Sequence, residues 1–248
     1  MRLRHDDPVA SALLRAIHDG DIETVQGLCR DHPGLAAAEI GDPRGGTRTP
    51  LMAVADWPGF FPNGAQVVAA LIAAGGDPNA RGSDPSGASG AEGPLHWAAS
   101  SDDAEVAAAL IDGGAILEAP GGSIGTPLAN AVGYGCWQVA DLLVARGAKV
   151  EPLWAAAALG VMSAVEGFFA ANPAPTREEL NHAFWQACHG GQPRAAAHLL
   201  ARGADPSWVP DYARKTALEV AKDAQGGGTR WGIVADWLER RIRIEKPR

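Results

Sequence analysis

The sequence contains few cysteines: Cys29, Cys136 and Cys188 are the three in 248 residues. A sparse, odd set argues against the disulfide framework of small secreted domains and fits a reducing compartment. The Cys-x-x-Cys and His-Glu-x-x-His spacings of common metal sites are also missing. We therefore expect a cytoplasmic protein with no metal site and no cofactor.

Long hydrophobic runs are missing as well, since no stretch approaches the ~18–20 apolar residues that cross a bilayer. Residues 1–8 carry charges with no apolar segment behind them, so we expect no secretory signal. Basic residues are outnumbered, 21 against 29 acidic ones, which gives a net charge of -8. An acidic surface repels phosphate backbones. We expect neither a membrane nor a nucleic-acid partner, and we interpret the basic residues after position 239 as a solvated helix end.

A recurring phrase organises the chain. It opens at Thr49–Leu51, Pro94–Ala99 and Thr126–Leu128. Each copy closes with a leucine-rich stretch that runs into glycine. These closing stretches are Leu71–Asn79, Leu110–Ala115 and Leu142–Ala148, and a degenerate copy closes with Leu199–Pro206. Pro94 and Pro127 open two successive copies 33 residues apart, a period typical of helical repeats.

Each part of the phrase has a mechanical reason. A threonine hydroxyl caps the first helix, and proline occupies the first helical position, where no amide hydrogen is needed. The alanine pair lets two helices approach closely. Glycine after the second helix adopts the left-handed conformation that ends it.

The phrase and its period resemble the ankyrin repeat, of a bacterial type. The resemblance implies an all-α ankyrin-repeat solenoid of stacked helix-turn-helix units with short β-hairpin fingers, one domain over 1–248. Weaker copies extend it, with Ser11 as the first cap and a turn at residues 20–25. Seven copies are expected at about 8–40, 45–81, 92–119, 124–150, 151–176, 177–210 and 214–241, followed by a tail at 242–248.

The chain departs from this pattern in several places. Residues 58–62 enlarge a helix–helix turn, and residues 82–93 enlarge a finger rich in glycine and serine. The finger before Pro152 is missing or stunted. Thr176 and Glu179 form a capping box that starts a long helix reaching about His189. We interpret the glycines at 121–125 as another finger and those at 226–228 as a flexible connection. Irregularities of this kind suit a closed-off pocket better than a uniform binding array.

The resemblance also implies which positions face a concave groove, namely the two before each helix–helix turn. These pairs are His18 and Asp19, Asp56 and Trp57, Ser100 and Ser101, Gly133 and Tyr134, Ala158 and Leu159, His189 and Gly190, and Asp223 and Ala224. Asp102 and Asp103 stand at a turn, where helix capping is their expected role.

Tryptophan is over-represented, with 8 copies against 2 tyrosines and 5 phenylalanines. Its large apolar face and single donor suit binding surfaces. The candidate ligand-binding residues are Trp57, Trp97, Ser101, Trp154, His182, Trp185 and Trp208. Packing between helices is the alternative for Trp97, Trp154 and Trp185, whereas Trp57 and Trp208 are the ones expected to be exposed.

Two histidines share a helix face with Trp185, since His182, Trp185 and His189 lie at i, i+3 and i+7. The histidines are ~10 Å apart along that helix, too far to share a metal. With an ordinary pKa near 6.5, His189 could shuttle protons. His96, in contrast, occupies the family's structural histidine position and is expected to bond backbone.

Two functions remain open. The favoured one is a binding protein that presents a groove lined by Trp and His to a partner protein. The alternative is binding of a small apolar or aromatic molecule, or a cofactor-independent enzyme running acid–base chemistry such as dehydration, conjugate addition, cyclisation or isomerisation. Its candidate catalytic residues are His189, Tyr134 and Asp56.

Overall fold

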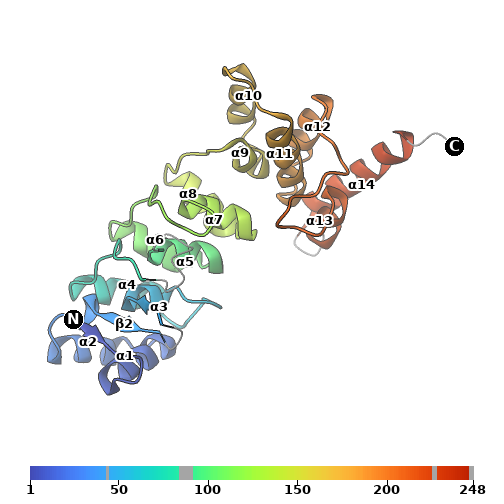
Figure 1. Ribbon diagram of the computed structural model, residues 1–248. Helices are drawn as coiled ribbons and strands as arrows, with labels where there is room; N and C mark the ends of the chain where they lie inside the picture. The colour runs from blue at the N-terminus through green and yellow to red at the C-terminus, as the bar shows by residue number, and fades with distance from the viewer. Residues whose placement is uncertain (43–44, 84–91, 225–227, 246–248) are drawn as a thin grey trace. The chain divides into compact units, whose positions relative to one another are not determined.

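A computed structural model describes residues 1–42, 45–83, 92–224 and 228–245. The fold is an all-α solenoid built from consecutive helix pairs (Figure 1). The chain divides into two compact units, Met1–Ala148 and Lys149–Arg248, here named unit 1 and unit 2. The division falls where the sequence lacks a finger, because only a short connection without a strand separates residues 146 and 152.

The described residues of unit 1 form four helix pairs. Their helices are α1 (Pro8–Asp19), α2 (Ile22–Asp31), α3 (Pro50–Val54), α4 (Gly64–Ala73), α5 (Pro94–Ser101), α6 (Ala104–Asp112), α7 (Pro127–Tyr134) and α8 (Trp137–Ala145). The first helices α1, α3, α5 and α7 pack on one another in order, and the second helices α2, α4, α6 and α8 do the same. Two layers of helices therefore bury a continuous apolar core between them.

The helix ends follow the predicted chemistry. The hydroxyls of Thr49 and Thr126 accept hydrogen bonds from the backbone of α3 and α7, and proline follows each threonine. Glycines after the second helices adopt left-handed conformations, as at Gly114, where φ is 96°. The predicted cap Ser11 is wrong: Asp7 caps α1, and Pro8 fills its first position. Asp7 wins because its carboxylate accepts from both Val9 and Ala10.

The first finger forms part of a small three-stranded sheet. Strand β2 (Glu39–Gly41) pairs antiparallel with β3 (Thr47–Arg48) as the expected hairpin, with Ile40 opposite Arg48. A strand that the sequence did not indicate, β1 (Arg2–Leu3), adds parallel to β2. A short 3-10 helix, η1 (Leu35–Ala37), precedes the sheet. In the described part of the chain the later fingers have no strands, apart from an isolated bridge between Thr47 and Ser83.

The described residues of unit 2 form three helix pairs, which pack around the first helix of the middle pair. They are α9 (Leu153–Leu159), α10 (Met162–Ala170), α11 (Arg177–His189), α12 (Pro193–Ala201), α13 (Ala217–Asp223) and α14 (Thr229–Glu245). Helix α11 packs against α9, α12, α13 and α14 and buries Phe184 at the centre of the core. Its predicted capping box is present, because Thr176 and Glu179 bond each other's backbone N–H.

Two other sequence predictions have clear outcomes. The enlarged turn forms the loop 55–63 between α3 and α4, so Asp56 and Trp57 follow the helix instead of ending it. Helix α14 runs through Glu245, so a tail from residue 242 is wrong. Most of the enlarged finger, at 84–91, and the glycines at 226–227 lie outside the described residues, as do the last three residues.

Candidate functional site

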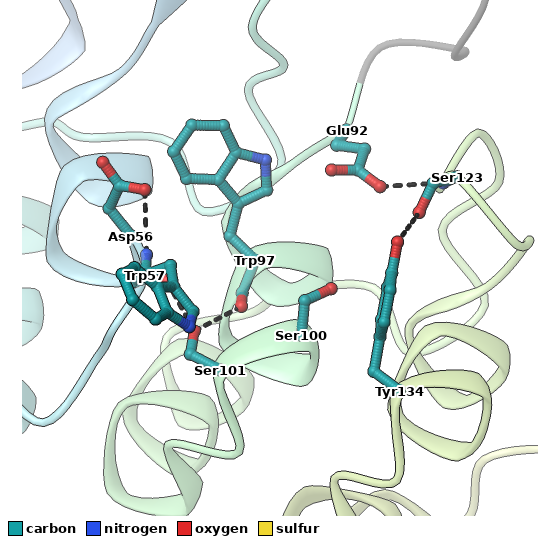
Figure 2. A pocket seen from close by; sticks show the side chains of 9 residues that line it. Asp56, Trp57, Glu92, Trp97, Ser100, Ser101, Ser123 and Tyr134 are labelled. Carbon is teal, nitrogen blue, oxygen red and sulfur yellow. Dashed lines mark hydrogen bonds between the residues drawn. The ribbon is translucent and has the colours of Figure 1, made fainter.

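Unit 1 carries a pocket of about 440 Å³ over the ends of its first helices (Figure 2). Its lining comes from α5, from the end of α7, from the loop between α3 and α4 and from the segments that precede α5 and α7: Ala55, Asp56, Trp57, Glu92, Trp97, Ser100, Ser101, Ser123 and Tyr134. Five of these residues are sequence-predicted site residues. The repeat stacking brings them together although up to 78 positions separate them in the chain.

The floor of the pocket is the last turn of α5. Trp97, Ser100 and Ser101 share one helix face because they are three and four residues apart. The Ser101 hydroxyl lies 2.7 Å from the carbonyl oxygen of Trp97 and 2.9 Å from that of Ala55. Its single proton is thus committed to backbone, and Ser101 is buried. In this position Ser101 joins α5 to the preceding repeat.

The loop 55–63 presents Trp57 at one side of the pocket. The Asp56 carboxylate accepts the Trp57 backbone N–H at 2.8 Å and pairs with the Arg48 guanidinium at 2.6 Å. Further along the loop, the Phe60 N–H donates to the Asp103 carboxylate at 2.7 Å. These two hydrogen bonds fix the backbone of the loop at Trp57 and at Phe60. The Trp57 side chain remains 80% exposed, which confirms the expected exposure.

The opposite side of the pocket is a hydrogen-bonded group of residues from three segments. The Ser123 N–H donates to Glu92 Oε1 at 2.8 Å, and the side-chain amide of the buried Asn130 donates to the same atom at 3.1 Å. The hydroxyls of Ser123 and Tyr134 are 3.1 Å apart. Figure 2 shows the Tyr134 ring standing on α7 with its hydroxyl toward Ser123. Sequence reasoning missed Glu92, Ser123 and Asn130.

Unit 2 has its own pocket, of about 600 Å³. Its lining combines the start of α11 with the segment that follows α12: Thr176, Glu178, Glu179, His182, Trp208, Val209, Pro210, Asp211 and Tyr212. His182 is the residue around which the aromatic side chains gather. Its ring centroid is 5.6 Å from that of Trp154, 6.0 Å from that of Trp208 and 5.8 Å from that of Tyr212.

The predicted tryptophans of unit 2 divide between packing and pocket. Trp185 is buried and its indole N–H donates to the Lys215 carbonyl at 2.9 Å, so its packing role is the one observed. Trp154 is half-buried against His182. Trp208, expected to be exposed, is half-buried at the pocket wall.

Four side chains form a hydrogen-bonded chain along α11. His189 Nδ1 lies 3.2 Å from Gln186 Oε1, the Gln186 amide donates to the Tyr212 hydroxyl at 3.1 Å, and that hydroxyl lies 2.7 Å from His182 Nε2. The chain connects the two histidines that the sequence placed on one helix face. Tyr212 was not predicted, and nothing in its local sequence pattern indicates that it meets α11.

Burial changes the chemistry of these histidines. It lowers the pKa of His189 to about 4, which corrects the expected value near 6.5 and leaves the imidazole neutral at pH 7. Burial also lowers the pKa of His182, although Glu178 and Asp211 oppose the shift. A half-buried histidine of pKa about 4 is a weak base, because catalytic efficiency is best for a pKa near the working pH.

The predicted catalytic trio is divided between the units. Asp56 and Tyr134 line the pocket of unit 1, whereas His189 belongs to unit 2. Besides Ser101, two positions implied to face a groove are buried: Ala158 on α9 and Gly190 at the end of α11. A Cβ built on Gly190 would lie 1.9 Å from the Ala158 carbonyl oxygen, so these residues serve close helix packing.

The structural roles expected of His96 and of the turn aspartates are confirmed. The Gly93 N–H donates to His96 Nδ1 at 3.3 Å, so the proton on Nε2 is free to bond the Ala119 carbonyl at 3.1 Å in the next finger. Asp103 caps α6 through the Val106 N–H. Asp102 accepts the Val139 N–H at 3.0 Å, which links α5 to the start of α8.

One helix pair of unit 1 matches a known family of repeats. Residues 93–121, which carry α5, α6 and the finger after them, match the ankyrin repeat. The chain thus contains an ankyrin repeat. The stacked helix pairs on either side agree with an ankyrin-repeat solenoid. A comparison with curated proteins finds no match. Ankyrin repeats generally mediate protein–protein interaction, and the matched repeat supplies the floor of the unit 1 pocket.

The described residues lack two features, a membrane-spanning helix and a cluster of metal-binding side chains. None of the described helices is both long and apolar enough to span a bilayer. Within the same residues, no three His, Cys, Asp or Glu side chains gather in a group able to hold a metal ion.

Proposed function

We propose that the protein binds a partner protein through the unit 1 pocket. The observation that carries the proposal is the exposure of two aromatic side chains on its rim, 80% for Trp57 and 54% for Tyr134. Exposed tryptophan and tyrosine are typical binding hot spots, because each offers a large apolar face with one polar group.

The pocket is held in shape before any partner arrives. Asp56 is fixed by Arg48, Phe60 by Asp103, and Glu92 by Ser123 and Asn130. Because side chains and loops that are already ordered lose little conformational freedom on binding, more of the contact energy contributes to affinity. A partner would meet two aromatic side chains whose backbone positions are already fixed.

The experiment selects short random peptides displayed on phage against the full-length protein. Selected peptides should lose binding to the Trp57→Ala variant by about 30-fold, the effect of a hot spot worth roughly 2 kcal/mol. Phe60→Ala is the matched control, since Phe60 lies on the same loop, is 64% exposed and does not line the pocket. Equal binding to wild type and Trp57→Ala, or no selected peptide at all, would contradict the proposal.

A second candidate function is small-molecule binding in unit 2. The chain from His189 through Gln186 and Tyr212 to His182 favours it, because a pocket of about 600 Å³ with aromatic walls and a few fixed polar groups is the usual form of a ligand site. The weak base His189 gives no support to acid–base catalysis, so the candidate is restricted to binding.

Ligand-observed NMR of the full-length protein with a set of small aromatic compounds tests this candidate. Compounds that bind in the unit 2 pocket should lose their signal with Trp208→Ala and keep it with Trp57→Ala. Small-molecule binding at this pocket would be contradicted if the compounds bind Trp208→Ala as well as wild type, or if no compound binds.

A further inference from the structure

We infer that the unit 1 pocket receives a basic side chain of the partner, and arginine in preference to lysine. The inference rests on the proposed protein binding at this pocket and specifies its chemistry. Three observations support it: a carboxylate that forms no ion pair with any cation among the described residues, aromatic rings on both sides, and a fixed geometry.

The two carboxylates of the pocket differ in how their charge is balanced. Asp56 is paired with the Arg48 guanidinium at 2.6 Å, so its charge is already compensated. Among the described residues, the groups that donate hydrogen bonds to the Glu92 carboxylate are neutral: the backbone N–H of Ser123 and the side-chain amide of Asn130. The Glu92 carboxylate therefore gives the pocket a net negative charge that a bound cation would balance.

Three aromatic rings line the same pocket as this carboxylate. Trp57, Trp97 and Tyr134 all line the pocket, and Figure 2 shows Trp57 and Tyr134 on opposite sides of it. The face of an aromatic ring carries negative electrostatic potential and attracts cations, tryptophan most strongly. Rings and carboxylate together favour a positively charged occupant.

Other occupants fit less well. An acidic side chain would meet the charges of Glu92 and Asp56. An apolar side chain would remove water from the Glu92 carboxylate without replacing its interactions, which is costly. Among basic side chains, the planar guanidinium can stack on a ring and donate two hydrogen bonds to one carboxylate, whereas an ammonium cannot do both. The net charge of -8 also steers basic partners toward the protein.

The hydrogen bonds of Glu92 make a conservative test possible. In Glu92→Gln the side-chain oxygen remains available to the Ser123 N–H and the Asn130 amide, while the negative charge is removed. The matched control is Glu105→Gln, because Glu105 is an exposed residue of α6 that does not line the pocket. Both variants change the net charge by the same amount.

The experiment uses the peptides selected on the full-length protein, remade with each arginine replaced by citrulline, which is neutral and nearly the same shape. We expect arginine to be enriched among the selected peptides. One citrulline replacement should weaken binding to wild type and to Glu105→Gln by about tenfold or more, and to Glu92→Gln by less than about threefold. Raising the salt concentration should weaken the arginine peptide more than the citrulline peptide.

The outcomes separate this inference from the proposed function. If the selected peptides lack basic residues but still depend on Trp57, the proposed protein binding stands and the inference of a basic side chain is overturned. A citrulline effect of equal size in wild type and Glu92→Gln would also overturn it. Peptides that bind Trp57→Ala as tightly as wild type would contradict both the proposed protein binding at this pocket and the basic side chain. Should Glu92→Gln fail to fold, the citrulline comparison on wild type decides alone, and an effect below about threefold there overturns the inference.

Discussion

The carboxylate of Asp103 accepts the backbone N–H of Phe60 at 2.7 Å, across 43 residues of sequence. Its other oxygen accepts the Val106 N–H at 3.1 Å and so caps α6. One buried side chain therefore caps the start of a helix in its own repeat. The same side chain fixes the loop of the preceding repeat that presents Trp57. The helix cap and the pocket loop depend on the same residue.

Replacement of Asp103 should cost stability. Asp103→Ala removes a helix cap and leaves the Phe60 N–H without its acceptor, so we expect a loss of about 1–3 kcal/mol in the free energy of unfolding. Asp103→Asn keeps one acceptor oxygen and should lose less. Urea unfolding at pH 7 measures both. Stability unchanged in Asp103→Ala would show that Asp103 does not hold the loop.

Two glycines offer a matched pair for the packing of unit 2. Gly190 has an ordinary helical φ of -79°, but an added Cβ would meet the Ala158 carbonyl oxygen at 1.9 Å. Gly190→Ala must move α11 away from α9, and we expect a loss of about 1–3 kcal/mol. Gly167 lies in α10 with no atom within 4 Å of such a Cβ, so Gly167→Ala should gain about 0.5–1 kcal/mol.

Thermal unfolding of both variants checks this contrast. Gly190→Ala should unfold at a lower temperature than wild type and Gly167→Ala at a higher one. A Gly190→Ala protein as stable as wild type would mean that α9 and α11 can separate without cost.

The half-buried His189 predicts a pH dependence of stability. Its pKa falls from 6.5 to about 4 on folding, so between these values the unfolded chain binds more protons than the folded one. The contribution is complete above pH 6.5 and is lost as the pH falls toward 4, by about 3 kcal/mol in all. His182 and His96 have lowered pKa values through burial and act in the same direction.

Urea unfolding between pH 4 and 7.5 tests the role of His189. We expect His189→Gln, which keeps a hydrogen-bonding side chain, to show a shallower loss of stability on acidification than wild type. Identical slopes would place the proton uptake on other groups.

The features that sequence reasoning predicted correctly are local ones. Thr126 and Pro127 fix the start of α7, and the capping box of Thr176 fixes the start of α11, because each bonds atoms within three residues. Exposure was expected for Trp57 and Trp208; it is observed for Trp57, whereas Trp208 is half-buried. The Ser11 cap failed because another local competitor, Asp7 before Pro8, was overlooked.

The site was only half predictable, for a physical reason. Asp56, Trp57 and Tyr134 follow from the repeat register, since equivalent positions of stacked repeats share a surface. Glu92, Ser123 and Tyr212 lie outside the helices, where no period fixes a side chain's direction. Their hydrogen bonds join residues 11 to 38 positions apart, and no local pattern records such partners.

The amino-acid sequence alone determined the helix pairs, their caps and the solenoid, because these depend on short-range bonding and on a period visible in the chain. Only the tertiary structure decided which polar groups meet, which charge is balanced and how deeply His189 is buried. Those properties depend on distances between separate repeats, and neither solvent access nor a neighbouring charge can be assigned to a residue until the repeats are packed together.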